Sequence, residues 1–91
     1  MYLGSMLVGD ETLIQVVSYG PTVRYISLET TGRYHIVDDT PAGAGNIHIR
    51  AMRHLLDSIP PDTTACFVHG DARWLRAWCQ CLEATELMKD Y

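Results

Sequence analysis

Three residue types that could support nucleophilic catalysis occur close together, at Cys66, His69 and Asp71. They lie at the end of the short apolar segment TACFVH, and α/β sheets commonly bind ligands at the carboxyl ends of such strands. A small enzyme centred on His69 and Asp71 is therefore one hypothesis. However, strand alternation puts Cys66 and His69 on opposite faces, which separates a nucleophile from its base. We predict instead that Asp71 caps a following helix, and we expect no catalytic residue.

Metal and cofactor binding have equally little support. The chain has four histidines, at His35, His48, His54 and His69. No two of them are four residues apart, and no Cys-x-x-Cys accompanies them. Cys79 and Cys81 are two residues apart on a predicted helix, so they point to different faces. The glycine-rich stretch TPAGAGN lacks the lysine of a phosphate-binding loop. We expect no metal and no cofactor.

Four arginines form a candidate anion-binding strip. Arg50 and Arg53 lie on the outer face of one predicted helix, and Arg73 and Arg76 lie on that of another. Side by side, these helices would present a basic strip suited to carboxylates or phosphates. Because acidic side chains interrupt the strip, an ordinary solvated helix face is the alternative.

Length and composition exclude several broad classes. The chain has 91 residues, of which 47% are hydrophobic, and a net charge of -4. These values fit one globular domain and exclude a disordered chain. No apolar run is long enough to span a membrane, and an acidic protein lacks the basic surface that general nucleic-acid affinity needs. The odd count of three cysteines favours reduced thiols in the cytoplasm.

The first half of the chain consists of predicted strands separated by short turns. They are Tyr2–Val8, Thr12–Tyr19, Val23–Glu29 and Arg33–Asp38. Short turns imply antiparallel neighbours, so this half predicts a β-meander. The first strand is the weakest, because Gly4-Ser5-Met6 is also typical of a cloning remnant that precedes a native start at Met6. The sequence leaves both readings of residues 1–8 open.

The second half predicts a helix, a strand and a helix. The first helix runs from Ile47 to about Ser58, after an Asn46 cap, and the strand is Thr64–His69. The second helix runs from Ala72 to about Met88. A helix between two strands usually makes a right-handed parallel crossover, so we predict a single α+β domain with a mixed sheet and both helices on one face. The predicted buried stripes are Ile49, Met52, Leu56 and Ile59 on the first helix, and Leu75, Trp78, Cys79 and Leu82 on the second.

Alternation along the strands predicts a sheet face that no helix covers. The side chains expected to face the helices are Ile14, Val16, Ile26, Leu28, Tyr34 and Ile36. Those expected on the other face are Gln15, Val17, Tyr19, Val23, Tyr25 and Val37. This second set is half apolar, and an uncovered patch of that kind marks an interface. The alternative is that Tyr2–Val8 folds over it.

Two passages carry a resemblance to a known family. They are ACFVHGDARWLRAW, at residues 65–78, and PAGAGNIHIRAMRHLLDSI, at residues 41–59. From Thr12 to Cys79 the chain resembles an RNase H-like domain. The resemblance implies that Asp71 occupies the position of one of the family's catalytic aspartates. The resemblance implies a parallel strand at Thr64–His69 beside Thr12–Tyr19. The other carboxylates that bind two Mg²⁺ ions are missing, so it implies a catalytically degenerate domain with a nucleic-acid or protein docking role.

Taken together, these features favour binding over catalysis. We expect a small non-catalytic module that inhibits or regulates a partner protein. Small acidic domains of this type are common among inhibitors carried by phages and other mobile elements, anti-CRISPR proteins included. The partner is a protein, or a second copy that forms a homodimer through the sheet face. Nucleic acid is not expected as the main partner, and neither is a membrane.

Overall fold

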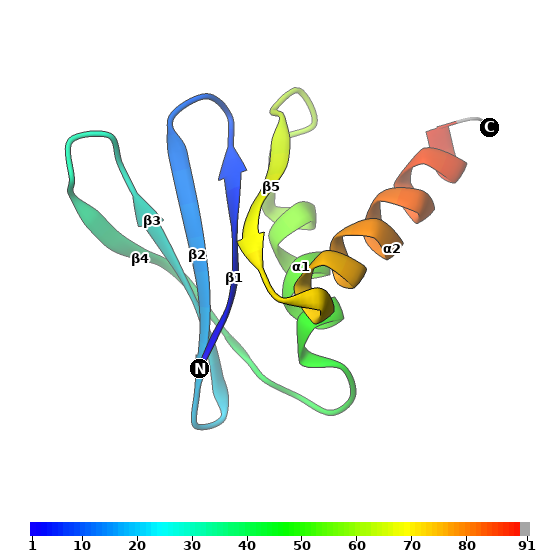
Figure 1. Cartoon of the computed structure of the whole chain (residues 1–91), viewed down its shortest axis with the longest axis horizontal. Coiled ribbons are helices and arrows are strands. Elements are labelled where there is room, and N and C mark those ends of the chain that lie inside the picture. The colour runs from blue at the N-terminus through cyan, green and yellow to red at the C-terminus, as the bar shows by residue number, and fades with distance from the viewer. Residues whose placement is uncertain (90–91) are drawn as a thin grey trace.

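The computed structural model describes the backbone of residues 1–89 and the side chains of residues 1–82. Its elements are β1 (Tyr2–Val8), β2 (Thr12–Tyr19), β3 (Thr22–Leu28), β4 (Tyr34–Pro41), α1 (Ile47–Ser58), β5 (Ala65–Gly70) and α2 (Ala72–Lys89) (Figure 1). The predicted α+β class is confirmed, and so is the order of meander, helix, strand and helix. No helix of the described residues is both long and apolar enough to cross a bilayer.

The five strands form one sheet in the order β4-β3-β2-β1-β5, and every neighbouring pair is antiparallel. The predicted mixed sheet is therefore wrong. It is β1 that occupies the place beside β2, so β5 pairs with β1 instead. The parallel pairing of β5 with β2 that an RNase H-like topology requires is wrong for the same reason. The connection through α1 crosses the sheet, from β4 at one edge to β5 at the other.

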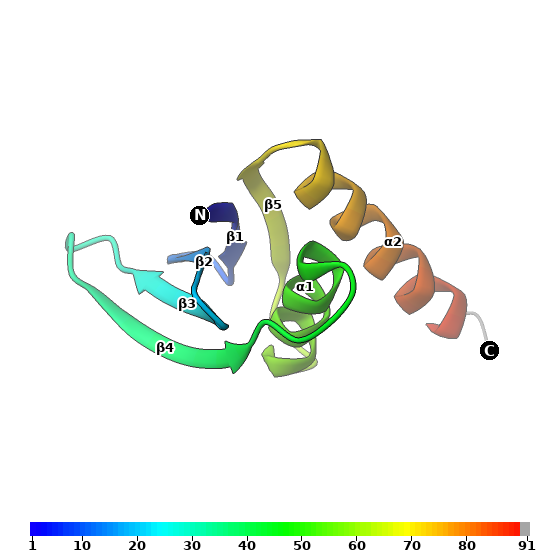
Figure 2. The same cartoon turned by 90° about the horizontal axis from the view of Figure 1, so that it is seen from below.

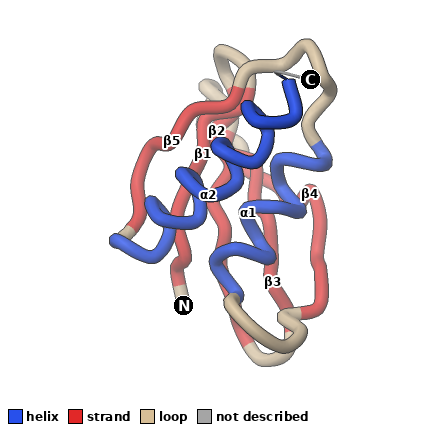
Figure 3. The backbone as a smooth tube through the Cα atoms, turned by 90° about the vertical axis from the view of Figure 1, so that its right-hand side faces the viewer, coloured by secondary structure: helices blue, strands red, loops and turns tan. Residues whose placement is uncertain are grey.

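Both helices lie on one face of the sheet, as predicted. The sheet curves around α1, and α2 lies beyond α1 next to β5 (Figure 2). The two helices run side by side in front of the strands (Figure 3). The N-terminal segment does not fold over the opposite face, because it forms β1, an internal strand between β2 and β5. No described element covers that face, which we call the open face.

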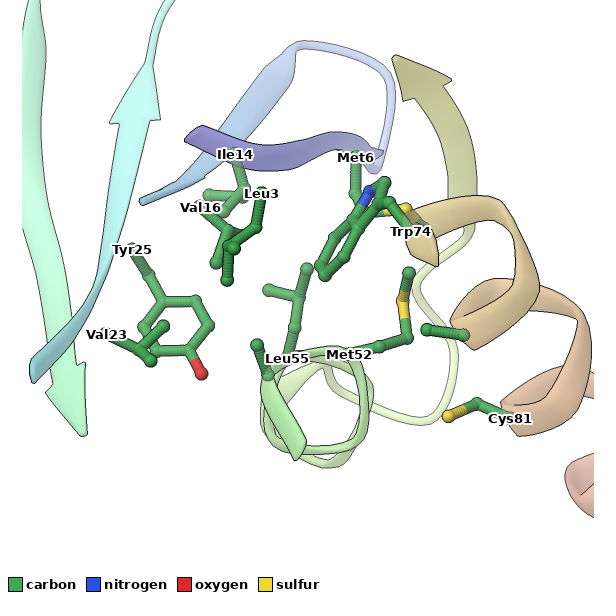
Figure 4. Packing of buried hydrophobic residues seen from close by; sticks show 12 residues of the cluster. Leu3, Met6, Ile14, Val16, Val23, Tyr25, Met52, Leu55, Trp74 and Cys81 are labelled. Carbon is green, nitrogen blue, oxygen red and sulfur yellow. The ribbon is translucent and has the colours of Figure 1, made fainter. Parts of the chain in front are cut away.

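The core lies between the sheet and the two helices (Figure 4). Its buried hydrophobic members are Leu3, Met6, Ile14, Val16, Val23, Tyr25, Ala51, Met52, Leu55, Trp74, Ala77 and Cys81. Trp74 lies directly over two glycines of the sheet. A Cβ atom at Gly4 would lie 2.1 Å from Trp74 Cδ1, and one at Gly70 would lie 2.5 Å from it. Glycine is therefore required at both positions for the indole to reach the sheet.

The predicted buried stripes are only partly correct: Met52 is buried, Ile49, Leu56 and Trp78 are partly buried against the core, and the centre of each buried face lies about one residue, or roughly 100°, away from the prediction. On α1 the buried positions are His48, Ala51, Met52 and Leu55. On α2, Trp74, Ala77 and Cys81 are buried, whereas Leu75 and Cys79 are exposed. The space above Gly4 and Gly70, which we call the slot, explains the rotation of α2. It accepts the Trp74 indole, and Trp78 is left at the margin of the core.

The predicted faces are correct for β2 and wrong for β3 and β4. A two-residue turn at Gly20-Pro21 pairs Tyr19 with Thr22, so even-numbered residues of β2 lie opposite odd-numbered residues of β3. Val16 therefore lies opposite Tyr25, and side chains directly opposite each other share a face. Consequently Val23 and Tyr25 belong to the core. The residues predicted to face the helices on these two strands, Ile26, Leu28, Tyr34 and Ile36, lie on the open face.

Candidate functional site

Three rows of side chains cross the open face, as the pairing of the strands defines them. The first row contains Tyr34, Leu28, Leu13, Leu7 and Cys66. The second row contains Ile36, Ile26, Gln15, Ser5 and His69. The third row contains Asp39, Arg24, Val17 and Tyr2. The first two rows contain no Asp, Glu, Lys or Arg.

The most exposed apolar side chains of these rows lie at the β4 edge. Tyr34 is 74% exposed and Ile36 is 52% exposed, whereas Leu7, Leu13 and Leu28 are half-buried by their neighbours. At the opposite edge, a polar group covers part of the second row. The Tyr2 hydroxyl donates to Ser5 Oγ at 3.0 Å and contacts His69 Nδ1 at 3.1 Å, and the two rings stack. The free apolar surface of the first two rows is therefore concentrated on β4.

The third row forms a charged border in which Arg24 and Asp39 neutralise each other. The Arg24 guanidinium donates to both carboxylate oxygens of Asp39, at 2.9 and 3.0 Å, and lies 4.9 Å from the centre of the Tyr19 ring. The hydrogen bond from Arg24 lowers the pKa of Asp39, and the carboxylate raises the pKa of Arg24. An apolar centre with a polar border is the usual anatomy of a protein interface.

Strand β4 is also a free edge of the sheet. Seven of its eight residues are exposed. Edge strands are usually protected from pairing with other chains by charges, prolines or bulges. Here the protection lies in the second half of the strand, where Val37 is bulged out of register and Asp38, Asp39 and Pro41 follow. The segment Tyr34–Ile36 has no such protection.

The structure assembles only part of the predicted partner-binding set. Gln15, Val17 and Tyr19 lie on the open face. Val23 and Tyr25 do not, since they are 2% and 1% exposed in the core. Val37 is 48% exposed at its bulge, where it lines a cavity beside α1. On β3 and β4, the apolar open-face residues that the prediction placed on the helical side were Ile26, Leu28, Tyr34 and Ile36. The length of the Gly20-Pro21 turn was the signal that would have placed the first two.

The residues of the hypothetical enzyme are Cys66, His69 and Asp71, and two of them make contacts with other groups. A bulge at Val68 brings Cys66 and His69 onto the same face, so their predicted separation is wrong. His69 Nδ1, however, contacts the Tyr2 hydroxyl. Asp71 caps α2, as predicted, accepting hydrogen bonds from the backbone nitrogens of Arg73 and Trp74. The Arg73 side chain lowers the pKa of Asp71 to about 2. No group of three metal-ligating side chains occurs among the described residues.

A groove on the helical side of the sheet runs between α1 and strands β3 and β4. Its first cavity, of about 310 Å³, is lined by Val8, Ile14, Tyr25, Val37, Asp38, His54, Leu55, Ser58, Ile59 and Pro60. Its second cavity, of about 420 Å³, is lined by Val23, Thr40, Pro41, Ala42, Arg50, Ala51, Arg53, His54 and Asp57. The two cavities adjoin along the groove, because His54 lines both of them and α1, β3 and β4 each contribute residues to both.

A single bridge divides this groove. His54 Nε2 on α1 lies 2.6 Å from Asp38 Oδ2 on β4. The Tyr25 ring lies beneath, 5.0 Å from the His54 ring, and its hydroxyl contacts Thr40 Oγ1 at 3.3 Å. Burial raises the pKa of Tyr25, so its phenol stays neutral. Of the predicted arginine strip, Arg50 and Arg53 line the second cavity, whereas neither Arg73 nor Arg76 does.

No protein-family model, no curated protein and no solved structure matches this chain. Its function therefore has to be inferred from the geometry of its own residues.

Proposed function

We propose that this chain is a non-catalytic protein-binding module that binds an extended segment of a partner protein along β4 and the open face. One observation carries the proposal: two uncharged rows cross a sheet face without a helix over it, and they end at an exposed edge strand. Contiguous exposed apolar patches of this kind mark interaction sites in soluble proteins. The module would inhibit or regulate its partner by covering the bound segment.

The accessible surface of the chain is consistent with a missing partner. A monomer of 10.2 kDa is expected to expose about 5300 Å². This chain exposes 5935 Å². Tyr34 and Ile36 of the open face, which are 74% and 52% exposed, contribute to this surface. A partner that covered the rows at β3 and β4 would remove both of them from water.

The free edge of β4 favours a partner segment in extended, strand-like conformation. An added strand would form main-chain hydrogen bonds with β4, and its alternate side chains would extend the first two rows beyond Tyr34 and Ile36. Those side chains must be apolar, because neither row offers a charged group. The net charge of -4 favours a partner of positive charge and opposes a second copy of this chain. We place this action in the cytoplasm, where the exposed thiols of Cys66 and Cys79 would stay reduced.

A pair of matched variants tests the proposal. Ile36 on β4 and Leu75 on α2 are 52% and 46% exposed, and only Ile36 lies on the open face. A partner would first be captured from the source cells with the wild-type chain, and then purified and titrated against Ile36→Lys and Leu75→Lys. We expect Ile36→Lys to weaken binding at least tenfold and Leu75→Lys to leave it within twofold. Hydrogen exchange should slow in β4 when the partner binds.

Two outcomes would contradict this function. Equal effects of the two variants would show that the partner does not use β4. A dimer of the wild-type chain in light scattering, abolished by Ile36→Lys, would make a second copy the occupant of the edge.

A further inference from the structure

We propose that the groove between α1 and strands β3 and β4 binds a small amphipathic carboxylate, with its head at Arg50 and Arg53 and its apolar tail in the first cavity. This site lies on the opposite side of the sheet from the open face, so it does not depend on the protein-binding function. Each cavity has the size of a small-molecule site.

The second cavity has the charge for an anionic head. Arg50 and Arg53 line it together with one acid, Asp57. Among the described residues, neither arginine has a carboxylate within 4.0 Å. Arg50 Nε donates to the Ala42 carbonyl oxygen at 3.2 Å, which holds the guanidinium at the cavity while its other donors stay available. Two cations against one acid favour a singly charged carboxylate over a doubly charged phosphate.

The first cavity has the composition for an apolar tail. Six of its lining residues are aliphatic or proline: Val8, Ile14, Val37, Leu55, Ile59 and Pro60. The Tyr25 ring, which extends from β3 toward α1, adds an aromatic floor (Figure 4). The polar members, Asp38, His54 and Ser58, are all partly exposed, so they stand at the mouth rather than in the depth of the cavity. An apolar tail in this cavity would be removed from water, and the polar groups at the mouth would stay hydrated.

The Asp38–His54 bridge lies between the head and the tail. The side chains of both partners are well exposed, at 49% and 37%, and exposed ion pairs contribute little to stability. A tail that runs from one cavity to the other therefore displaces the bridge easily. Because Asp38 holds His54 in the bridge and carries a negative charge near the ligand, Asp38→Asn should increase the affinity for an anion. Because Asp38→Asn also changes the net charge by one unit, its effect has to be compared with that of a charge change outside the groove.

Octanoate is a suitable probe, with octan-1-ol and acetate as ligands that lack the charge or the tail. Backbone amide chemical shifts would be followed by NMR during each titration. We expect octanoate to shift the amides that line the groove and to bind at least tenfold more tightly than either control. Equal affinity for octan-1-ol, or shifts outside the groove, would overturn the proposal. Shifts confined to the open face and to residues 34–36 of β4, which do not line the groove, would instead show that the ligand uses the protein-binding surface and would overturn the proposal.

Arginine variants give the matched control. Arg53→Gln removes one cation from the second cavity, whereas Arg76→Gln removes the same charge from α2 outside it. We expect Arg53→Gln to weaken octanoate binding at least fivefold, Arg76→Gln to change it less than twofold, and Asp38→Asn to strengthen it. Equal losses of affinity in the two arginine variants would show that net charge alone controls octanoate binding, and this result would overturn the proposal. Unchanged amide spectra away from each substitution would show that the variants fold.

Discussion

Two valines distinguish the observed register from the one that the hydrophobic pattern predicts. The pattern places Val17 and Val23 on the same uncovered face. In the structure Val17 is half-exposed on the open face, and Val23 is 2% exposed in the core. Val→Ala is the same chemical change at both sites, and both sites lie in internal strands. The loss of β propensity therefore cancels in the comparison, and burial decides the difference.

The magnitude follows from the burial of Val23. Truncation to alanine removes the equivalent of two buried methylene groups, at about 0.8 kcal/mol each. The cavity that remains adds up to roughly 1 kcal/mol more. Val23→Ala should therefore lower the free energy of unfolding by about 1.5–3 kcal/mol. Val17→Ala should lower it by about 0.5 kcal/mol, since a site on the open face already contacts water.

Urea unfolding, followed by tryptophan fluorescence and by circular dichroism, measures both values if the two signals change together. The corresponding fall in melting temperature is about 6 °C or more for Val23→Ala, at roughly 4–8 °C per kcal/mol for a domain of this size. Equal losses at the two sites, or a larger loss at Val17, would refute the register of β2 and β3. The proposed binding face would then be wrong as well.

Three further substitutions test the packing and the caps. Gly4→Ala drives a methyl group into the Trp74 ring, so we expect a loss of about 1–3 kcal/mol and a red shift of the tryptophan emission; an unchanged spectrum would contradict the slot. Asn46→Ala removes the acceptor for the backbone nitrogens of His48 and Ile49, at 3.0 and 3.1 Å, and should cost about 1 kcal/mol in thermal unfolding. His48 is 4% exposed, its Nε2 has no hydrogen-bond partner among the described residues, and burial lowers its pKa from 6.5. The wild type should therefore lose stability as the pH falls below about 6.5, because the unfolded chain then takes up a proton that the folded chain resists. His48→Leu should remove that loss, so its gain in melting temperature over the wild type must be larger at pH 5.5 than at pH 8.

The elements of this fold could be predicted from local residues. Asn46 and Asp71 begin the two helices, and the alternation of β2 places Ile14 and Val16 in the core. These features depend on neighbours within a few residues, and the sequence contains those neighbours in order. Even the pairing of β2 with β3 was available in principle, from the length of the Gly20-Pro21 turn.

Long-range pairing decided the rest. Bulges at Leu3, Val37 and Val68 each change which residues share a face, and a bulge exists only relative to the strand beside it. The bulge at Val68 brought Cys66 and His69 onto one face, and the bulge at Val37 turned that residue toward the groove. The rotation of α2 likewise depends on Gly4 and Gly70, which meet Trp74 only when β1 and β5 lie side by side.

By itself, the sequence determined a small α+β domain with capped helices and one sheet face free of any helix. Only the tertiary structure decided which side chains occupy that face, because a single inserted residue or a rotation of about 100° exchanges inside for outside. It also created the groove, since Asp38 and His54 are far apart in the chain and meet only where α1 crosses the curved sheet.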